Sequence, residues 1–532
     1  MYEQTLERFS ERYPHLAFPA LSWEPIEPPQ QPIEPWVRKL QIEKVEVLYI
    51  YGMDDGAAYR ALKPWLSENP KRRIVFLIDH SGYVATLIHQ GAPLLEDPQV
   101  EIAVDFSIDE LAEKFPMDQV EVVALPGRSN RQFRTLRGTL LEKAALARSF
   151  YMEKIYGHLI TKRFVRNFPR VQEAFYANRL KNAFEGVPAI ICGAGPSLEN
   201  DLPLLKQLDS RAILIAGGSA VGALTLRGIE PHFAIAVDPN LEEFKRFRNS
   251  FYFEGPFIFS TRLCPQVFST CNGPFGYLRS GVGSIPELWL EEELKLDDEP
   301  LLAADLDQNT IAVTPLALAF AHLLGCNPII LSGVDLAYTQ GRRYASSVDF
   351  EESLKELKHE KNATNQILTR KDKQGNWVTT AVRWEMERQS LASFARKHPK
   401  TTWVNATQGG LRIHRFAEKP LAEVLAPFHQ QPNLKERIQR EIEKHPMPSM
   451  EGLLDRLKES LFRAIDCLEI LAGEKEGSAA LAEIDLMEEI ATAVFLVDLP
   501  KACRQHFGTE TPPSQERWKF YLKIARNHAS VF

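Results

Sequence analysis

The sequence predicts an α/β protein with a parallel sheet in its central domain, a smaller α/β domain before it and a helical domain after it. Three observations predict this fold class. Short apolar runs alternate with helical segments from residue 44 to residue 415, as in parallel sheets that helices cover on both faces. Several runs end in glycine, serine or aspartate, which are typical of a turn from strand into helix. From residue 450 onward, leucines recur at helical spacing instead.

The composition is that of a folded protein with several domains. Its 532 residues exceed what one core holds, so we expect about three domains. A hydrophobic content of 44% and a charged content of 25% are typical of soluble globular proteins. The net charge of -7 disfavours a general nucleic-acid surface or attraction to acidic membranes, so we expect no nucleic-acid partner.

The sequence also predicts the compartment. No apolar run reaches eighteen residues, and the first twelve residues are charged and mixed, so we expect neither a transmembrane helix nor a signal peptide. None of the six cysteines forms a Cys-x-x-Cys pair. We therefore expect a cytoplasmic protein with reduced thiols and no structural zinc.

We predict five consecutive parts along the chain. An extended lead-in comes first, because four prolines between residues 25 and 32 exclude a helix or a central strand. A long helical connector, rich in Arg, Lys, Phe and Tyr, separates the two α/β domains. The parts are the lead-in (1–36), the smaller α/β domain (37–130), the connector (131–185), the central domain (186–416) and the helical domain (417–532).

The two outer domains are predicted from periodicity alone. The smaller α/β domain has strands over 45–51, 73–79, 100–104 and 120–125, with helices over 57–67, 83–89 and 109–114. The turn at residues 51–56 is either a second ligand site or a tight turn into a capped helix, and we favour the turn. The helical domain has helices over 434–444, 450–472, 479–499 and 514–529. Such a domain is by default a docking or oligomerisation module.

A glycine loop follows the first strand of the central domain, residues 189–192. Gly193 and Gly195 let the backbone turn tightly and approach a ligand without a Cβ in the way. Pro196 and Ser197 open the next helix, where Ser197 is placed to act as the N-cap and leave N–H groups for a phosphate. A glycine turn that binds nothing is the alternative when this loop is taken alone.

The loop is not a dinucleotide fingerprint. That fingerprint needs a third glycine at the place of Leu198, and Pro196 is foreign to it. We therefore exclude NAD.

Two further strand ends lie on the same predicted rim, because the carboxyl ends of parallel strands meet at one edge of a sheet. Gly217-Gly218-Ser219 is a second glycine turn, with Ser219 as the expected cap of a helix. The strand over 233–237 ends in Asp238. Asp238 either orients a sugar hydroxyl or a metal ion, or caps the following helix, and the sequence leaves both open.

Residues after the strand at 328–331 complete the rim. Ser332, Gly333 and Asp335 combine a small residue, a glycine and a carboxylate at a strand end. Tyr338 and Tyr344, six residues apart, can place two phenolic donors on one side of a bound anion. The alternative for two loop tyrosines is surface packing.

The last strand end of the central domain is polar and rich in glycine. Asn405 and Thr407 offer polar side chains. Gly409 and Gly410 allow a base or a sugar to approach closely.

Three separated segments together resemble a known family: residues 191–198 (ICGAGPSL), 331–341 (LSGVDLAYTQG) and 404–410 (VNATQGG). They look like the motility accessory factor (Maf) family of flagellin glycosyltransferases, which attach nonulosonic acids of the sialic or pseudaminic type to Ser or Thr. The same domain is named after MptE-like 6-hydroxymethylpterin diphosphokinases, which move a diphosphate from ATP to a pterin alcohol. The resemblance covers residues 186–415 most strongly.

The central domain is also similar to bacterial lipooligosaccharide sialyltransferases, which use CMP-sialic acid. This resemblance implies a Rossmann-like central sheet, with Tyr338 and Tyr344 donating hydrogen bonds to the departing nucleotide phosphate. We predict as nucleotide-binding residues Gly193, Ala194, Gly195, Pro196, Ser197, Gly217, Gly218, Ser219, Thr310, Ile311, Ala312, Ser332, Gly333, Asn405, Thr407, Gly409 and Gly410.

The sequence departs from the sialyltransferases at two kinds of position. Ala194 and Gly218 stand where those enzymes have asparagines that contact the nucleotide. Their catalytic histidine precedes the helix that here spans 381–398, and residues 375–380 contain no histidine. His359 lies upstream on a charged helix and is a poor substitute. Asp335 or Asp238 could serve as the base, so the catalytic candidates are Tyr338, Tyr344, Asp335 and Asp238.

The first hypothesis is therefore a Maf-like glycosyltransferase with a CMP-activated nonulosonic acid as donor and a protein acceptor, flagellin-like in the family. No cofactor is certain, although Mg²⁺ is compatible with the carboxylates. The second hypothesis is an MptE-like diphosphokinase that uses ATP and Mg²⁺ through Asp238 and Asp335. The third is a non-catalytic nucleotide-binding or scaffold relative, which the missing histidine favours.

Overall fold

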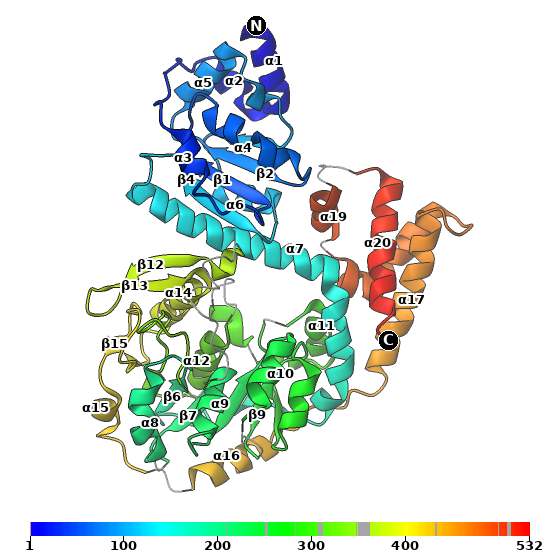
Figure 1. Cartoon of the computed structure of the whole chain (residues 1–532). Helices are drawn as coiled ribbons and strands as arrows, with labels where there is room; N and C mark the ends of the chain where they lie inside the picture. The colour runs from blue at the N-terminus through cyan, green and yellow to red at the C-terminus, as the bar shows by residue number, and fades with distance from the viewer. Residues whose placement is uncertain are drawn as a thin grey trace. The chain divides into compact units, whose positions relative to one another are not determined.

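The computed structural model describes the chain except for residues 1, 209, 251–253, 282, 300, 307–311, 347, 349–361, 431–432, 498 and 508–511. The described residues form two compact units. The N-terminal unit contains residues 2–151 and the returning segment 362–368, and the larger unit contains residues 152–348 and 369–532. Figure 1 follows the chain by colour from blue to red. The finer division into five parts stays a prediction.

The N-terminal unit is built on a four-stranded parallel sheet in the order β3-β2-β1-β4. Its helices follow the strands in alternation, as the sequence predicts, and every residue of β1 is buried. The strands are β1 (Val47–Tyr51), β2 (Arg73–Leu77), β3 (Val100–Ala103) and β4 (Val120–Ala124), and the helices between them are α4 (Ala57–Ser67), α5 (Ser81–Gln90) and α6 (Ile108–Lys114).

The first residues of the chain belong to the core of this unit. The proline-rich segment 23–32 has no helix or strand, as its composition predicts. The residues before it are largely helical, and Phe9 and Ile33 are buried in the same apolar cluster as strands β1 and β2. The helices are α1 (Tyr2–Arg12), α2 (Ala17–Ala20) and α3 (Ile33–Val37).

The turn after β1 is a capped helix start. The buried carboxylate of Asp54 accepts hydrogen bonds from the N–H groups of Gly56 (2.9 Å) and Ala58 (2.8 Å) in the first turn of α4. Both carboxylate oxygens satisfy N–H groups that a helix leaves unpaired at its start. The favoured interpretation of residues 51–56, a tight turn into a capped helix, therefore agrees with the structure.

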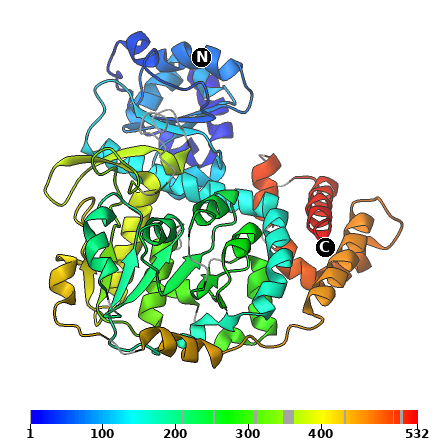
Figure 2. The same cartoon turned by 60° about the horizontal axis from the view of Figure 1, so that its bottom comes forward.

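The larger unit is built on a nine-stranded parallel sheet in the order β15-β14-β11-β6-β7-β8-β9-β10-β5. Figures 1 and 2 show its strands between helices on either face. The strands are β5 (Phe175–Tyr176), β6 (Ala189–Cys192), β7 (Ile213–Gly217), β8 (Phe233–Ala236), β9 (Phe257–Phe259), β10 (Phe275–Tyr277), β11 (Ile329–Ser332), β14 (Trp403–Asn405) and β15 (Ala417–Glu418), while β12 (Ile367–Lys371) and β13 (Trp377–Ala381) pair separately.

The helices that cover the sheet of the larger unit form two layers, one on each face, and each layer packs on the sheet through its own apolar cluster. The cluster that contains Leu198 and Phe247 packs on one face of the sheet, and the cluster that contains Leu316 and Leu391 packs on the other. The predicted fold class, an α/β protein with a Rossmann-like central sheet and a helical C-terminal region, is confirmed. The helices are α8 (Leu198–Lys206), α9 (Ser219–Thr225) and α10 (Leu241–Phe247) in the first layer, and α12 (Val313–Leu323) and α14 (Val382–Lys397) in the second.

The predicted connector is mostly one long helix, α7 (Arg131–Gln172), with non-helical backbone angles at Tyr156. The helix ends earlier than predicted, because Phe175 and Tyr176 form the edge strand β5 of the large sheet. Asn167, which is fully buried, ties α7 to the segment after β9. Its Nδ2 donates to the carbonyl oxygens of Thr261 (2.8 Å) and Leu263 (2.7 Å).

The C-terminal region is helical, with α15 (Leu421–Leu425), α16 (Leu434–Glu443), α17 (Leu453–Leu471), α18 (Ala479–Glu488), α19 (Leu499–Phe507) and α20 (Ser514–Ala529). A further helix, α11 (Ile285–Glu293), comes earlier in the chain, between β10 and α12. The single helix predicted over 479–499 is wrong. A break follows α18. Ser460 Oγ donates to the Glu489 carboxylate (2.6 Å) and accepts from the Ala491 N–H (3.0 Å). Tertiary hydrogen bonds to α17 thus replace helical ones.

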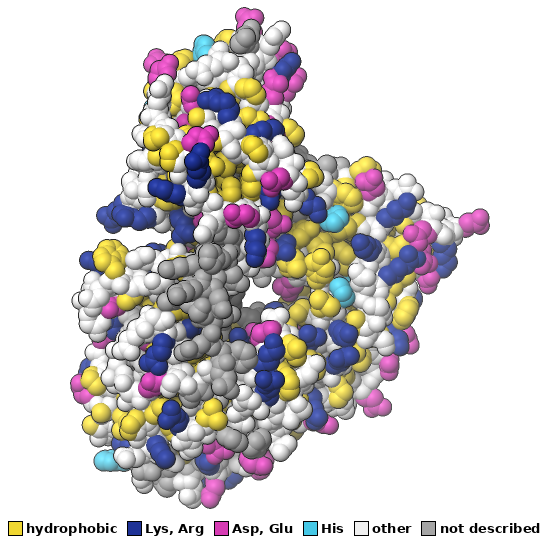
Figure 3. Space-filling model, in the orientation of Figure 1, with side chains coloured by type: hydrophobic (Ala, Val, Ile, Leu, Met, Phe, Trp, Pro, Cys, Tyr) yellow, Lys and Arg dark blue, Asp and Glu magenta, His cyan; other side chains and the backbone are white. Residues whose placement is uncertain are grey.

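The surface charges are mixed, and the cysteines are unpaired with one another. Lys and Arg side chains are interspersed with Asp and Glu on the face in Figure 3. All six cysteines are free thiols, and five of them are buried. In the part of the chain that the structure describes, no helix has the length and apolarity needed to cross a membrane.

We predict that Asn167→Asp destabilises the larger unit. A carboxylate cannot donate to the two carbonyl groups, and each buried carbonyl left unpaired costs about 1–3 kcal/mol. Thermal unfolding of the variant should show a clearly lower midpoint than the wild-type protein. The control is Asn200→Asp, an exposed position in the first turn of α8. Equal midpoints for both variants would contradict the anchoring role of Asn167.

Candidate active site

A cavity of about 330 Å³ opens at the carboxyl ends of the central strands of the larger sheet. Strands β6, β7, β8 and β11 all end at its wall, as the rim argument predicts. Helices from both layers complete the wall: α10 on one side, and the first turns of α12 and α14 on the other. The lining consists of residues 191–195, 217–220, 238, 243, 246, 312–314, 317, 333–337, 343–344, 383–384 and 387.

The structure brings many of the predicted site residues together at this cavity. The predicted residues that line it are Gly193, Ala194, Gly195, Gly217, Gly218, Ser219, Asp238, Ala312, Gly333, Asp335 and Tyr344. The predicted residues that lie outside its lining are Pro196, Ser197, Ser332, Tyr338, Asn405, Thr407, Gly409 and Gly410. Thr310, Ile311 and His359 lie outside the described residues.

The glycines of the first loop are needed for a reason that the sequence did not reveal. A Cβ on Gly193 would overlap the Gly333 carbonyl oxygen, and a Cβ on Gly195 would overlap the Asp335 carboxylate. The N–H groups of Gly193 and Gly195 donate to the carbonyl oxygens of Ser332 and Gly333, both at 2.8 Å. The two glycines therefore allow the loops after β6 and β11 to pack against each other, beside any ligand.

Asp335 joins these two loops through its buried carboxylate. One oxygen accepts from the hydroxyl (2.6 Å) and the N–H (3.3 Å) of Ser197, and the other accepts from the Thr339 hydroxyl (2.6 Å). Burial raises the pKa of Asp335, while the bonds from Ser197 and Thr339 oppose the rise. The expected side-chain cap at Ser197 is wrong, because its hydroxyl donates to Asp335 and makes no cap hydrogen bond to α8.

The loop after β14 packs against the loop that carries Asp335. Thr407 Oγ1 accepts from the Val334 N–H (3.1 Å), and Asn405 Oδ1 accepts from the Thr407 N–H (3.2 Å). Gly410 has a φ of +71°, and a Cβ there would overlap the backbone of Asp335. The polar and glycine residues of this loop thus make packing contacts, and their predicted contact with a nucleotide stays a prediction.

The second glycine turn differs from its predicted form by one residue. Gly218 holds the N-cap position of α9, and Ser219 is already the first helical residue. The expected serine cap is therefore wrong, because the strand β7 runs to Gly217 and leaves only Gly218 for the turn. Both glycines and Ser219 still line the cavity.

Asp238 does not cap α10. Its Oδ1 accepts from the N–H (2.9 Å) and the Nδ2 (2.8 Å) of Asn240, which itself holds the N-cap position. Its Oδ2 lies 3.6 Å from Nη1 of Arg246. Arg246 also donates to the buried Glu243 carboxylate at 2.7 Å. Burial raises the pKa of Glu243 to about 7, although the Arg246 charge opposes the rise.

Three arginines line the cavity, and the sequence reasoning missed all of them. Arg246 comes from α10, Arg343 from the loop after β11, and Arg383 from α14. Burial lowers the pKa of Arg343, and the charges of Arg383 and Arg246 lower it further, while Tyr344 and Tyr338 oppose the effect. Guanidinium groups bind phosphate and carboxylate groups through paired hydrogen bonds.

The two predicted tyrosines occupy different positions. Tyr344 lines the cavity, with the Arg343 guanidinium 4.8 Å from the centre of its ring. Tyr338 is buried and packs against Trp384, with ring centres 4.8 Å apart. Burial raises the pKa of the Tyr338 hydroxyl, whereas the charges of Arg383 and Arg343 lower it.

One further carboxylate lines the cavity. Glu387 lies one turn after Arg383 on α14 and is 8% exposed. Burial raises its pKa to about 7, and the Thr314 hydroxyl and the Arg383 charge oppose the rise. Among the described residues, no group of three or more His, Cys, Asp or Glu side chains could hold a metal ion.

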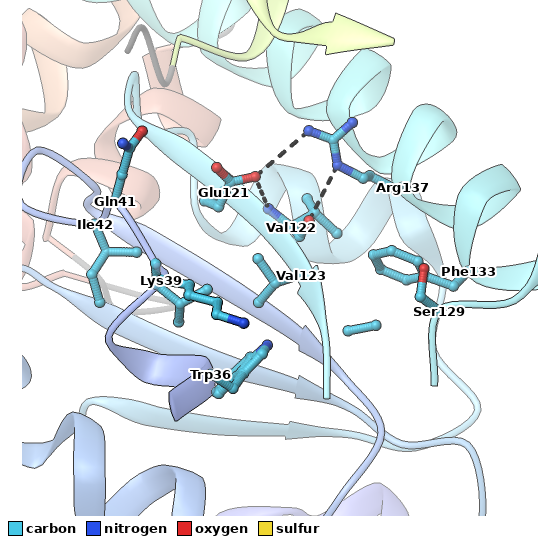
Figure 4. Close-up of a pocket in the computed structure, with 12 residues that line it drawn as sticks. Trp36, Lys39, Gln41, Ile42, Glu121, Val122, Val123, Ser129, Phe133 and Arg137 are labelled. Atoms are coloured by element: carbon cyan, nitrogen blue, oxygen red, sulfur yellow. Dashed lines mark hydrogen bonds and ion pairs between the residues drawn. The ribbon is translucent and has the colours of Figure 1, made fainter. Parts of the chain in front are cut away.

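A second cavity, of about 390 Å³, lies within the N-terminal unit beside the edge strand β4 (Figure 4). Arg137 Nε donates to the Val122 carbonyl oxygen (3.2 Å), and its Nη2 lies 3.6 Å from Glu121 Oε1. That carboxylate oxygen also accepts from the Val122 N–H (3.1 Å). These side chains occupy backbone groups that an added strand would use, so they protect a sheet edge.

Comparison with known proteins agrees with this fold. Residues 162–341 match the family described as 6-hydroxymethylpterin diphosphokinase MptE-like. The chain is similar to the structure of a Maf glycosyltransferase from Magnetospirillum magneticum AMB-1, with a TM-score of 0.50 and 15% sequence identity over 99% of this chain and 87% of that chain. No curated protein matches the sequence. The predicted resemblance to the Maf and MptE-like proteins is confirmed, with the structural likeness showing a shared fold.

We predict that Asp335→Asn destabilises the protein and that Asp238→Asn does not. An amide presents one acceptor in place of two, so Ser197 or Thr339 loses a charge-assisted hydrogen bond of about 1.5–3 kcal/mol. At Asp238 the amide oxygen can still accept from Asn240 on the open rim. Thermal unfolding of the two variants measures the difference, and a stable Asp335→Asn variant would argue against a framework role.

Proposed function

We propose that this chain is a glycosyltransferase that moves a nonulosonic acid from a CMP-activated donor to a Ser or Thr hydroxyl of a protein acceptor. The observation that carries the proposal is the convergence of Arg246, Arg343 and Arg383 on one cavity at the rim of a Rossmann-like sheet. The likeness in fold to a Maf glycosyltransferase supports it.

The chemistry of the transfer fits this arrangement. When the bond between the sugar and the CMP phosphate breaks, the phosphate takes the electron pair and gains a negative charge. Guanidinium groups stabilise that charge most where water is excluded. Tyr344, beside Arg343, offers a phenolic donor to the same oxygen. A sugar that leaves in this way needs stabilisation of its leaving group more than a strong nucleophile.

The glycine turns supply room for the donor. Gly193–Gly195 and Gly217–Ser219 line the cavity with backbone, which lets a nucleotide lie close to the strand ends. The donor's phosphate and carboxylate each carry a negative charge, which arginine side chains of the lining can bind.

A diphosphokinase is the second candidate, and the match of residues 162–341 to the MptE-like family favours it. That reaction would use ATP, and Mg²⁺ held by carboxylates. Asp238 has the more open carboxylate, whereas both oxygens of Asp335 already accept hydrogen bonds from Ser197 and Thr339. A non-catalytic nucleotide-binding relative is the third candidate.

Ligand-induced stabilisation separates the three candidates. The panel consists of CMP, CDP, UDP, and ATP with Mg²⁺, each tested by thermal shift on the full chain. A ligand at about a hundred times its Kd stabilises the folded state by roughly 2.7 kcal/mol. We expect CMP to stabilise the protein. A shift only with ATP and Mg²⁺ would favour the diphosphokinase, and no shift with any nucleotide would favour a non-catalytic scaffold.

A matched pair of variants tests the arginine wall in the same assay. Arg343→Gln should raise the Kd for CMP about 10-fold or more, because a hydrogen bond to a charged group contributes about 1.5–3 kcal/mol. Its neighbour Arg342 pairs with Glu199 at 3.1 Å and lies outside the cavity lining. Arg342→Gln should therefore bind CMP like the wild-type protein, and equal losses in both variants would contradict the assignment.

We also predict that Tyr344→Phe reduces turnover more than nucleotide binding. The phenolic hydroxyl would donate to the phosphate oxygen as its charge develops, so its removal raises the barrier while the ground-state contacts persist. Release of CMP from a CMP-activated sugar measures turnover, and titration with CMP measures binding. Unchanged turnover would exclude a donor role for this hydroxyl.

A further inference from the structure

A transfer to a hydroxyl group needs an acceptor for the hydroxyl proton, and a carboxylate near the reacting atoms can be that acceptor. Among the residues that the structure describes, four carboxylates line the cavity: Asp238, Glu243, Asp335 and Glu387. Their surroundings differ enough to rank them.

Three of the four are committed to other contacts. Both oxygens of Asp335 hold the loops together through Ser197 and Thr339. Glu243 is 1% exposed and is paired with Arg246 at 2.7 Å. Asp238 accepts two hydrogen bonds from Asn240 on one oxygen and faces Arg246 with the other. Each of these carboxylates therefore stabilises the wall of the cavity.

Glu387 has a different environment. It comes from α14, one turn beyond Arg383, and lines the cavity with 8% of its surface exposed, against 1% for Glu243 and 2% for Asp335. The groups that act on its charge are the Arg383 guanidinium on its own helix and the Thr314 hydroxyl on α12. A hydroxyl leaves the carboxylate with further lone pairs to accept a proton.

The position of Glu387 also suits the geometry of a displacement. Glu387 comes from the helix layer of α12 and α14, whereas Arg246 comes from the layer of α8, α9 and α10. The wall from the layer of α12 and α14 thus holds Glu387 and Arg383, and the wall from the other layer holds Arg246. A displacement with inversion requires the base and the leaving group on opposite faces of the sugar, which a phosphate bound at Arg246 and a hydroxyl bound at Glu387 satisfy.

We propose that Glu387 is the general base that removes the proton from the acceptor hydroxyl; this assignment rests on the proposed glycosyltransferase function. In the step, the acceptor oxygen forms a bond to the anomeric carbon, and the bond from that carbon to the CMP phosphate oxygen breaks. The phosphate keeps the electron pair of the broken bond. The hydroxyl proton passes to a carboxylate oxygen of Glu387 and is later lost to water.

The pKa of Glu387 supports the assignment. Burial raises it to about 7, so near neutral pH the carboxylate is both a competent base and readily deprotonated again. The base must be ionised to act. The rate should therefore rise with pH through about 7 and level off above it.

The test uses the full chain and CMP-N-acetylneuraminic acid, with water as the acceptor, and measures release of CMP. Glu387→Gln should slow the release about 100-fold or more, while the Kd for CMP stays within twofold. It should also abolish the rise of the rate near pH 7, and formate should partly rescue Glu387→Ala. The control is Glu385→Gln, a buried glutamate of α14 outside the cavity lining, which should release CMP at the wild-type rate.

The outcomes distinguish a failure of the Glu387 assignment from a failure of the proposed glycosyltransferase function. If a folded Glu387→Gln variant releases CMP at the wild-type rate, Glu387 is not the general base, while the proposed function stands. A wild-type protein that neither binds CMP nor releases it from the donor overturns the proposed function and the base together. If Glu387→Gln does not fold, Glu387→Asp replaces it, and release of CMP at the wild-type rate by this variant, whose carboxylate is displaced by one methylene, overturns the assignment.

Discussion

The hydrogen bonds of the Asp335 carboxylate are the constraint on which the candidate active site depends. One oxygen binds Ser197 at the start of α8, and the other binds Thr339 in its own loop. Gly195 leaves the room that the carboxylate needs, and Gly410 leaves room for the Asp335 backbone. Three strand ends, those of β6, β11 and β14, are joined in this way. A site whose walls are held by a buried charge with satisfied acceptors is rigid before any ligand arrives.

Electrostatics then gives the cavity its chemical character. Arg246 is neutralised in part by Glu243, and burial together with the charges of Arg383 and Arg246 lowers the pKa of Arg343. The guanidinium groups of Arg343 and Arg383 lie over the rings of Tyr344 and Trp384. Burial leaves Glu387 with a pKa of about 7. Arginines and a carboxyl group with a pKa of about 7 in one cavity are a combination suited to moving a group from a phosphate to a hydroxyl.

Sequence reasoning found the strands and the rim but not the arginines. Glycines and small polar residues at strand ends are visible in sequence, because a turn from strand to helix demands them within a few residues. Arg246, Arg343 and Arg383 lie on two helices and a loop, without a common spacing. A signal was available for Arg343, which stands next to the predicted Tyr344. For Glu387 none was available, since a glutamate in an amphipathic helix is ordinary.

What the sequence alone determined rests on local patterns: which runs are buried strands, which segments are helical, and, from strands that end in small or acidic residues, that the ends of β6, β7, β8 and β11 share one rim. Backbone preferences and apolar periodicity act over neighbouring residues, so they can be recognised without the fold. Tertiary structure decided the rest. It directed the Ser197 hydroxyl to Asp335 instead of the helix backbone, broke the helix predicted over 479–499 at Glu489, and brought Arg246 and Glu387 to one cavity from opposite helix layers. The hydrogen bonds behind the first two outcomes join residues 138 and 29 positions apart, which no local preference specifies.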